Sequence, residues 1–402
     1  MEITLAARLR SIYEDLHAHP ELSMHEHRTA GIAAAWLREH GYAVHEGLGT
    51  TGVVGVLANG PGPTVLLRAD MDALPVQEQT GLPYTSLTDG VMHACGHDVH
   101  VTCLLGAAAE LAAGRDSWRG TLVALFQPAE ETAAGARAMI DDALYETVPR
   151  PDVVLGQHVA PLPAGLLGLR PGPAFAATDS LRITMHGRGG HGSRPEVTVD
   201  PVVMAAATVM RLHTVVSREV AGGDTAVLTV GASNAGTKAN IIPDRAELLL
   251  NVRSYDPGVR ERVLGAIGRI VTAEAQAAGA PRPAEVETIE TAPAVVNDVG
   301  ACERIRAALE SVVGAGHVVD PGPVTGSEDV GILASAAGAP IVFWLLGGAD
   351  PALFADATSV PELAAAMAGI PSNHSPYYAP VPEPTLAIGV AALQAAARTW
   401  LT

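Results

Sequence analysis

The sequence has few charged residues and still fewer aromatic ones. Charged side chains make up 17% of the 402 residues and aromatic side chains 4%, whereas 48% are hydrophobic. A disordered chain has the opposite balance, with high charge and little apolar surface to bury, so that class is excluded. The length exceeds that of a usual single domain. We therefore expect a closely packed protein with two folded units.

Positive charge is also scarce. The 25 Lys and Arg residues face 43 Asp and Glu residues, which gives a formal net charge of −18. A surface this acidic repels nucleic-acid phosphates and anionic lipid headgroups. The longest apolar runs, such as "AAAMAGI", fall far short of the roughly 20 residues that a membrane-spanning helix needs. We expect no nucleic-acid partner and no membrane partner.

Cysteine is rare. Cys95, Cys103 and Cys302 are odd in number and widely spaced, so a disulfide framework is not expected. The N-terminal stretch lacks the basic region and apolar core of a secretory signal peptide. Both observations predict a reducing, cytoplasmic location. We expect Cys103 and Cys302 to be inert core residues.

The first part of the chain alternates between helical and strand-like patterns. Apolar residues recur at three- and four-residue steps over 4–40, which predicts two helices separated at Pro20. Strands that alternate with helices form a largely parallel sheet, so we expect an α/β domain with a mixed, largely parallel sheet flanked by helices. The other elements expected here are helices at 101–114 and 136–144 and strands at 53–58, 64–71, 120–128 and 152–159.

The pattern changes near residue 180. Strand, helix, two strands, helix and strand then follow one another, which is the ferredoxin-like order of a small α+β sandwich. The α/β pattern resumes afterwards, so we expect a domain at 180–291 inserted into a larger domain formed by 1–179 and 292–402. The elements expected after the insertion are helices at 300–313, 328–337 and 383–400 and a strand at 340–347.

Polar side chains follow several predicted strands at the points where the strands stop. Asp70 and Asp72 end one strand, Glu130 and Glu131 follow a second, and His158 ends a third. Ligands of open α/β sheets gather at the carboxyl ends of the strands. We therefore expect these side chains to share one edge of one sheet.

The stretch "MHACGHDVH" has three interpretations when it is taken alone. It can be a metal site, a thiol nucleophile beside its base, or ordinary core packing. Together with the strand-end residues it supplies a thiolate, a carboxylate and imidazoles, the donors that suit zinc or a similar transition ion. The candidate ligands are Cys95, His97, Glu131, His158 and His374.

This donor set is larger than one tetrahedral site needs. Either two ions share a donor, or one residue lies outside the ligand shell. Two ions can polarise a carbonyl and activate water, and Glu130 can then serve as general base. Asp70, Asp72 and Asp98 would orient the ligand imidazoles through hydrogen bonds. The role of His100 stays open.

Motifs along nearly the whole chain resemble the M20 metallopeptidase-like amidohydrolases, in particular the aminoacylase and hippurate-hydrolase branch. As an ordered set they are highly specific. They are "HAHPELSMHEHRTA", "RADMDALPV", "MHACGHDVH", "QPAEE", "GQHV", "GRGGHGSRP", "NIIPD", "GSED" and "NHSP".

The resemblance implies a two-metal hydrolase that cleaves the amide bond of N-acyl-L-amino acids, which are small-molecule substrates. It implies that Glu130 is the general base and that Asp72 supports the catalytic centre. The same five candidate ligands would hold two divalent ions per subunit, with zinc as the first expectation and manganese, cobalt or nickel as alternatives.

The resemblance also gives the inserted domain a role as a lid and dimerisation surface. His191 would stabilise the oxyanion, and Asn240 and Arg253 would contact the substrate. A homodimer or tetramer formed through the lid is implied. One position departs from the family, because Glu196 stands where relatives commonly have a histidine.

Other functions stay open at this point. On the same scaffold, the enzyme can be a dipeptidase or a carbamoyl-amino-acid hydrolase. An amidase with Cys95 as nucleophile would leave Glu131, His158 and His374 unexplained. A non-catalytic binding or metal-storage protein would leave Glu130 without a purpose.

Overall fold

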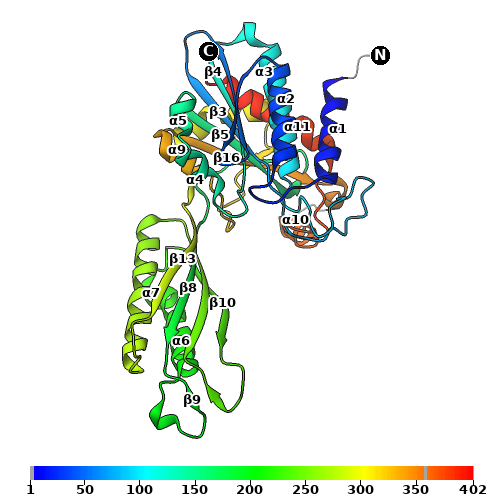
Figure 1. Ribbon diagram of the computed structural model, residues 1–402. Coiled ribbons are helices and arrows are strands. Elements are labelled where there is room, and N and C mark those ends of the chain that lie inside the picture. The colour runs from blue at the N-terminus through cyan, green and yellow to red at the C-terminus, as the bar shows by residue number, and fades with distance from the viewer. Residues whose placement is uncertain (1–3, 357–359, 402) are drawn as a thin grey trace. The chain divides into compact units, whose positions relative to one another are not determined.

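The computed structural model describes residues 4–356 and 360–401. The chain divides into two compact units (Figure 1). The first consists of Met1–Ala174, Val296–Gly322 and Asp329–Thr402, and the second of Phe175–Val295 and Pro323–Glu328. The short return segment of the second unit, 323–328, was not indicated by the sequence pattern.

The described residues of the first unit contain a mixed, largely parallel sheet, as expected. Its strand order is β1-β2-β4-β3-β5-β16-β6-β15. The central strands β4, β3, β5 and β16 are mutually parallel, and β6 is parallel to β15. The pairs β1–β2, β2–β4 and β6–β16 are antiparallel. The strands are β1 (Ala43–Leu48), β2 (Gly52–Asn59), β3 (Thr64–Asp70), β4 (Gly120–Gln127), β5 (Val153–Pro163), β6 (Leu167–Gly168), β15 (Val318–Val319) and β16 (Ile341–Ala349).

Helices cover both faces of this sheet. Figure 1 shows α1, α2, α3 and α11 grouped on one side of β3, β5 and β16, and α4, α5 and α9 on the other. Alternate residues of β3, such as Val65 and Leu67, pack with the first group in one buried cluster. The helices are α1 (Leu5–Ala18), α2 (His27–Glu39), α3 (His97–Ala113), α4 (Gly135–Asp141), α5 (Leu144–Thr147), α8 (Val299–Val313), α9 (Val330–Ala337), α10 (Val360–Ala368) and α11 (Pro382–Arg398).

The start of α3 and the presence of β1 differ from the predictions. Helix α3 begins at His97, four residues before the expected start, because the polar stretch "HDVH" hides the apolar pattern of its buried first turn. Strand β1 was missed because most of its side chains are exposed or half-buried. An outer strand of this kind lacks the continuous apolar run by which a buried strand is recognised in a sequence.

The second unit has the expected ferredoxin-like arrangement. Its four-stranded sheet has the order β10-β12-β8-β13, and all neighbours are antiparallel. Helices α6 and α7 pack their apolar faces against it and form a separate core. The elements are β8 (Ala177–His186), β9 (Gly190–His191), α6 (Pro201–Glu219), β10 (Ala226–Ala235), β11 (Ile241–Ile242), β12 (Arg245–Ser254), α7 (Pro257–Ala277) and β13 (Glu285–Ala292). Two short strands, β7 (Gly172–Phe175) and β14 (Val295–Asn297), complete the assignment.

Among the described residues, no helix is long and apolar enough to span a membrane.

The buried side chains of the central strand β3 should contribute strongly to the free energy of unfolding of the first unit. Leu67 is fully buried, so Leu67→Ala should lower the free energy of unfolding by about 2–5 kcal/mol through lost burial and the cavity left behind. The matched change Leu87→Ala, at a side chain that is 75% exposed, should stay within about 0.5 kcal/mol of the parent. Denaturant unfolding of both variants checks this, and equal losses would contradict the assigned core.

Candidate metal centre

The candidate centre lies where the parallel strands of the first unit end. Asp70, the last residue of β3, pairs in register with Gln127, the last residue of β4. His158 was expected at the end of its strand, but β5 continues to Pro163 and His158 pairs with Leu345 of β16. The shared edge therefore forms as expected, with His158 inside its strand.

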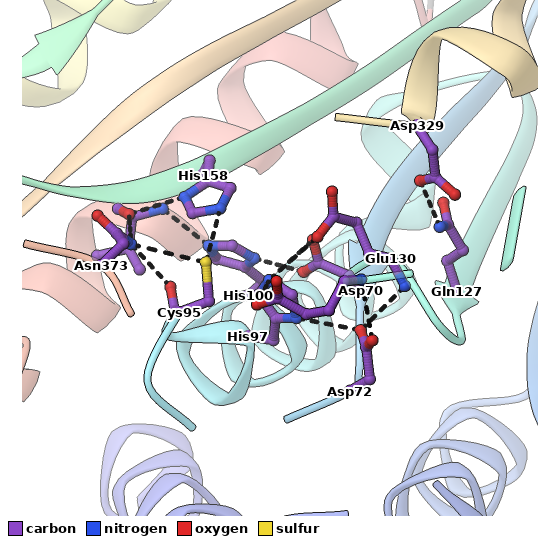
Figure 2. A network of polar contacts seen from close by, with 12 residues as sticks. Asp70, Asp72, Cys95, His97, His100, Gln127, Glu130, His158, Asp329 and Asn373 are labelled. Atoms are coloured by element: carbon purple, nitrogen blue, oxygen red, sulfur yellow. Dashed lines mark hydrogen bonds and ion pairs between the residues drawn. The ribbon is translucent and has the colours of Figure 1, made fainter. Parts of the chain in front are cut away.

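A close approach of backbone to β5 places the thiol of Cys95. Gly96, which precedes α3, has a φ of 84°, and a Cβ there would lie 2.4 Å from the Val159 Cγ1 atom. Glycine alone meets both the conformation and the lack of space. The Cys95 Sγ atom consequently lies 3.5 Å from Nε2 of His158 (Figure 2).

A strained turn carries the two glutamates. In the 128–135 turn, Ala129 and Ala133 have φ values of 48° and 51°, a left-handed conformation that costs roughly 1–3 kcal/mol per residue. The carboxylate of Asp72 accepts hydrogen bonds from the backbone N–H groups of Glu130 (3.1 Å) and Glu131 (3.0 Å). These bonds hold the turn in the conformation that presents both glutamates to the centre.

Both glutamates face the same imidazole. Nε2 of His97 lies 3.8 Å from Oε2 of Glu130 and 3.8 Å from Oε1 of Glu131. The opposite ring nitrogen of His97, Nδ1, lies 3.3 Å from Oδ1 of Asp72. Asp72 therefore faces both the imidazole of His97 and the turn that carries the two glutamates (Figure 2).

The fifth candidate ligand comes from the loop before α11. The N–H group of His374 donates to the carbonyl of Ala94 (2.8 Å), and its Nε2 atom lies 3.3 Å from Oε2 of Glu131. Its side chain is 56% exposed, whereas Cys95 and His97 are buried. The neighbouring Asn373 amide donates to the Cys95 carbonyl at 3.0 Å and so ties this loop to the Cys95 loop.

All five candidate ligands are thus brought together. Their donor atoms form groups in which every pair lies within 4.8 Å: Cys95, His97 and His158; Cys95, Glu131 and His374; His97, Glu130 and Glu131. Cys95 is common to the first two groups, so a thiolate there can serve two neighbouring positions.

Unmet buried polar atoms mark the same place. Neither ring nitrogen of His97, nor Oε1 of Glu131, has a hydrogen-bond partner among the described residues. Buried polar atoms are rarely left in this state, because desolvation without a partner is costly. A divalent cation would satisfy these atoms, and the soft and borderline donors fit a transition ion.

The protonation states of the centre also depend on burial. Burial raises the pKa of the Cys95 thiol well above its usual range and raises the pKa of Glu131. Burial lowers the pKa of His158 and leaves a neutral ring with a lone pair. For His97, burial is outweighed by the charge of Asp70, and the pKa is raised. A bound cation favours the deprotonated form of each ligand, so metal binding would release protons.

The structure assigns His100 a supporting position. Its Nε2 atom accepts a hydrogen bond from the N–H group of Val159 (2.8 Å), so the ring proton of a neutral imidazole resides on Nδ1, which faces Oδ1 of Asp70 at 2.5 Å. Both ring nitrogens are therefore engaged, and His100 is not available as a ligand. It connects Asp70 to the strand that carries His158.

A buried polar network lies behind Asp70, and the sequence analysis did not identify it. The guanidinium of Arg68 donates to Asp70 (2.8 Å), to Gln127 (2.9 Å) and to Asp329 (3.2 Å). Burial raises the pKa of Asp329 to about 6. An arginine in the middle of an otherwise apolar strand was the available signal, because a buried charge requires partners.

Comparison with known sequences identifies the family. Residues 66–398, most of the chain, match the sequence profile of peptidase family M20/M25/M40. The chain belongs to this M20 family.

Two curated relatives and one solved structure illustrate the similarity of this M20 chain. It is 38% identical over 328 residues to N-acetyl-L-cysteine deacetylase of Bacillus subtilis (strain 168), which covers 81% of this chain and 77% of the relative. It is 44% identical over 277 residues to the hippurate hydrolase of Campylobacter jejuni, which covers 68% and 72%. The structure of the Bacillus subtilis YXEP protein, described as a dinuclear metal-binding M20 peptidase, has a TM-score of 0.77 at 30% identity and covers 99% of both chains.

One expected contact is absent in this M20 chain. Asp98 was expected to orient a ligand imidazole, but its carboxylate accepts instead from the ring of His17 (2.7 Å) and the N–H group of Val99 (2.9 Å). Asp98 points away because it occupies the second position of α3, one residue after the ligand. The imidazole of His97, a candidate ligand, faces Asp70 and Asp72.

The candidate residues of the second unit separate into two places. His191 of β9 pairs with Ile241 of β11, and the N–H group of Gly192 donates to the carbonyl of Asn240 (2.9 Å), so His191 and Asn240 are neighbours. Arg253 lies at the far end of β12, where its Nε donates to Asn251. The structure does not bring Arg253 together with His191 and Asn240 within this unit.

A buried histidine of the first unit, His17, should make the free energy of unfolding depend on pH. Burial opposes the charged form of His17, but hydrogen bonds to Asp98 and Glu78 outweigh it and raise the pKa from 6.5 to about 9. A raised folded-state pKa stabilises the folded protein fully below about pH 6.5 and loses that effect as pH rises to about 9. The difference in unfolding free energy between the parent and His17→Gln should therefore shrink across this window.

Unfolding curves at several pH values, in the presence of a chelator, measure this difference. The His25→Gln variant, which removes an exposed imidazole from the same part of the chain, is the control. A His17→Gln difference that stays constant from pH 6 to 9 would show that the charge of this ring contributes nothing.

Proposed function

We propose that this protein is a metal-dependent amidohydrolase that cleaves the amide bond of N-acyl-L-amino acids. The observation that carries the proposal is the convergence of five metal-type donors beside a further carboxylate, Glu130. Support comes also from the relatives, since the names N-acetyl-L-cysteine deacetylase and hippurate hydrolase both describe removal of an acyl group from an amino acid.

The proposed centre holds two divalent ions, with zinc as the first expectation and manganese, cobalt or nickel as alternatives. Bound there, the ions would polarise the scissile carbonyl and activate water for attack. Glu130 takes the proton from that water and returns it to the leaving amine. Asp72 keeps Glu130 in position through the turn backbone. The proposed ligands are Cys95, His97, Glu131, His158 and His374.

The second unit is proposed to act as a lid that supplies groups to the substrate. An imidazole such as His191 can donate to a developing oxyanion, and its exposed position beside glycines suits that role. Asn240 is exposed next to it. Arg253 would pair with the free carboxylate of the amino acid, because a guanidinium binds a carboxylate through two hydrogen bonds.

Metal removal and one conservative substitution test the proposal. Hydrolysis of acetyl-, benzoyl- and long-chain N-acyl amino acids, dipeptides and carbamoyl amino acids should be assayed with metal content measured on the same sample. A chelator should abolish hydrolysis, and Glu130→Gln should retain metal while kcat falls by about 10²–10⁴-fold. Hydrolysis that persists in the metal-free protein would contradict the proposal.

The same samples distinguish the competing functions. An amidase with Cys95 as nucleophile would tolerate the chelator, lose activity on thiol alkylation and form an acyl-enzyme visible by mass spectrometry. A binding or storage protein would be indifferent to Glu130→Gln in every measured property. Cleavage of dipeptides or carbamoyl amino acids in preference to N-acyl amino acids would redirect the substrate assignment on the same centre.

The second unit is also proposed to form a homodimer, or a tetramer built from it. Helix α6 exposes apolar side chains, with Val203 65% and Met210 73% exposed. Next to this helix, β10 is an edge strand that exposes Val227. An apolar helix face beside an open strand edge is a surface that pairing with a second copy would cover.

Charge on this face should weaken association. Met210→Glu should raise the dimer dissociation constant at least about tenfold, because an interface core excludes an unpaired carboxylate. Leu87→Glu, an equally exposed apolar position in the first unit, is the control and should leave association unchanged. Light scattering over a concentration series measures both, and a dimer that survives Met210→Glu would place the interface elsewhere.

We propose a cytoplasmic location because the three cysteines form no disulfide bond with one another. Cys95, Cys103 and Cys302 are all free and buried, as expected of a protein in a reducing compartment.

A further inference from the structure

Glu26 is a fully buried carboxyl group that the proposed mechanism does not use. Its exposed fraction is 0%, and no Lys, Arg or His side chain of the described residues lies within ion-pair distance. Burial raises the pKa of this group. Burying a carboxyl group without a cation costs free energy of folding, so the hydrogen bonds that this group makes in the folded protein need to be accounted for.

Glu26 does not cap the helix that it precedes. Glu26 precedes α2 as its N-cap residue, but its side chain caps no N–H group of that helix. Those groups are taken by Glu21, which accepts from the N–H groups of Arg28 and Thr29, both at 2.8 Å. Helix α2 is therefore capped without Glu26.

The carboxyl of Glu26 is directed instead at the 128–135 turn. Its Oε1 atom accepts from the N–H group of Ala129 (2.8 Å) and from that of Met24 (3.0 Å), while Oε2 faces the hydroxyl of Thr51 at 2.5 Å. Ala129 is the left-handed residue immediately before the two glutamates. Glu26 therefore holds the point at which the backbone turns toward the centre.

A second residue of the same segment acts on the same turn. The hydroxyl of Ser23 donates to Oδ2 of Asp72 (2.6 Å), the carboxylate that binds the N–H groups of Glu130 and Glu131. The segment is fixed alongside the end of β3, because Leu22 forms a parallel bridge with Ala73 and Ala73 donates to the carbonyl of Glu21 (2.8 Å).

Three consecutive N–H groups of the turn thus end on two carboxyl groups. Ala129 donates to Glu26, and Glu130 and Glu131 donate to Asp72. Since the direction of each Cα–Cβ bond follows from the backbone, fixing these three amides fixes the direction in which both glutamate side chains leave the turn.

We propose that Ser23 and Glu26 are positioning residues for the centre, which hold the 128–135 turn so that Glu130 and Glu131 are correctly placed. The kinetic part of this inference rests on the proposed function. What Glu26 contributes is a hydrogen-bond acceptor for Ala129 rather than a charge. A glutamine can reproduce it, with its carbonyl on Ala129 and its amide donating to Thr51.

The first test needs no activity. Amide hydrogen exchange of the metal-free protein should show Ala129 protected in the parent and in Glu26→Gln, and exchanging at least about tenfold faster in Glu26→Ala. Zinc affinity of the same samples should fall about 10–100-fold in Glu26→Ala, since Glu131 is then misplaced. Unaltered protection of Ala129 in a folded Glu26→Ala protein would overturn the inference.

The second test is kinetic. With metal restored, Glu26→Ala should lower kcat about 10–100-fold with little change in KM, and Glu26→Gln should restore kcat to near the parent value. Glu21→Gln is the matched control from the same segment, expected to lower Tm with kcat unchanged because the side chain of Glu21 binds only α2. If Glu21→Gln and Glu26→Ala lose the same amount of kcat for each degree by which Tm falls, Glu26 contributes only to stability and the positioning role is contradicted.

Ser23→Ala keeps the inference testable if Glu26→Ala does not fold. Ser23 is half-buried and small, so its loss should leave Tm nearly unchanged while kcat falls several-fold. A Ser23→Ala protein with the parent kcat would contradict the proposal. If the parent hydrolyses no N-acyl amino acid, the proposed function fails, and amide exchange and zinc affinity still decide the positioning role.

Discussion

The carboxylate of Asp72 is the interaction on which the candidate centre depends. It binds the backbone of Glu130 and Glu131 on one side and lies 3.3 Å from the ring of His97 on the other. The imidazole and the carboxylate of two candidate ligands, together with the proposed general base, are thereby positioned by one group. Metal and base must be aligned to a fraction of an ångström for proton transfer, and a single rigid acceptor links their positions.

Several carboxylates lie close to Asp72, and the guanidinium of Arg68 balances part of their charge. Asp70 and Asp329 both contact Arg68, which is buried in the strand leading to the centre. Removing Arg68 would leave two buried carboxyl groups without their cation, a change that strongly destabilises folded proteins. Divalent ions placed among the acidic side chains would complete the same charge balance from the other side.

The sequence allowed the sheet edge and its donors to be predicted because their signals are local. Apolar runs such as 64–71 mark buried strands, and polar residues that follow them mark the edge. The start of α3 was missed because its first turn is polar yet buried. The contact between Glu26 and Ala129 joins residues 103 positions apart, so neither spacing nor composition could reveal it. His191, Asn240 and Arg253 were named by resemblance alone, and their spacing in the sequence could not show that strand pairing sets Arg253 at the end of β12 away from the other two.

The strand order has a consequence for how the protein is made. Strand β16 lies between β5 and β6 in the sheet, although about 180 residues separate it from β5 in the chain, including the whole second unit. During synthesis the second unit can fold while the sheet still lacks its central strand. The loop with His374 leaves the ribosome later still, so a nascent chain cannot assemble the full donor set until that loop has emerged.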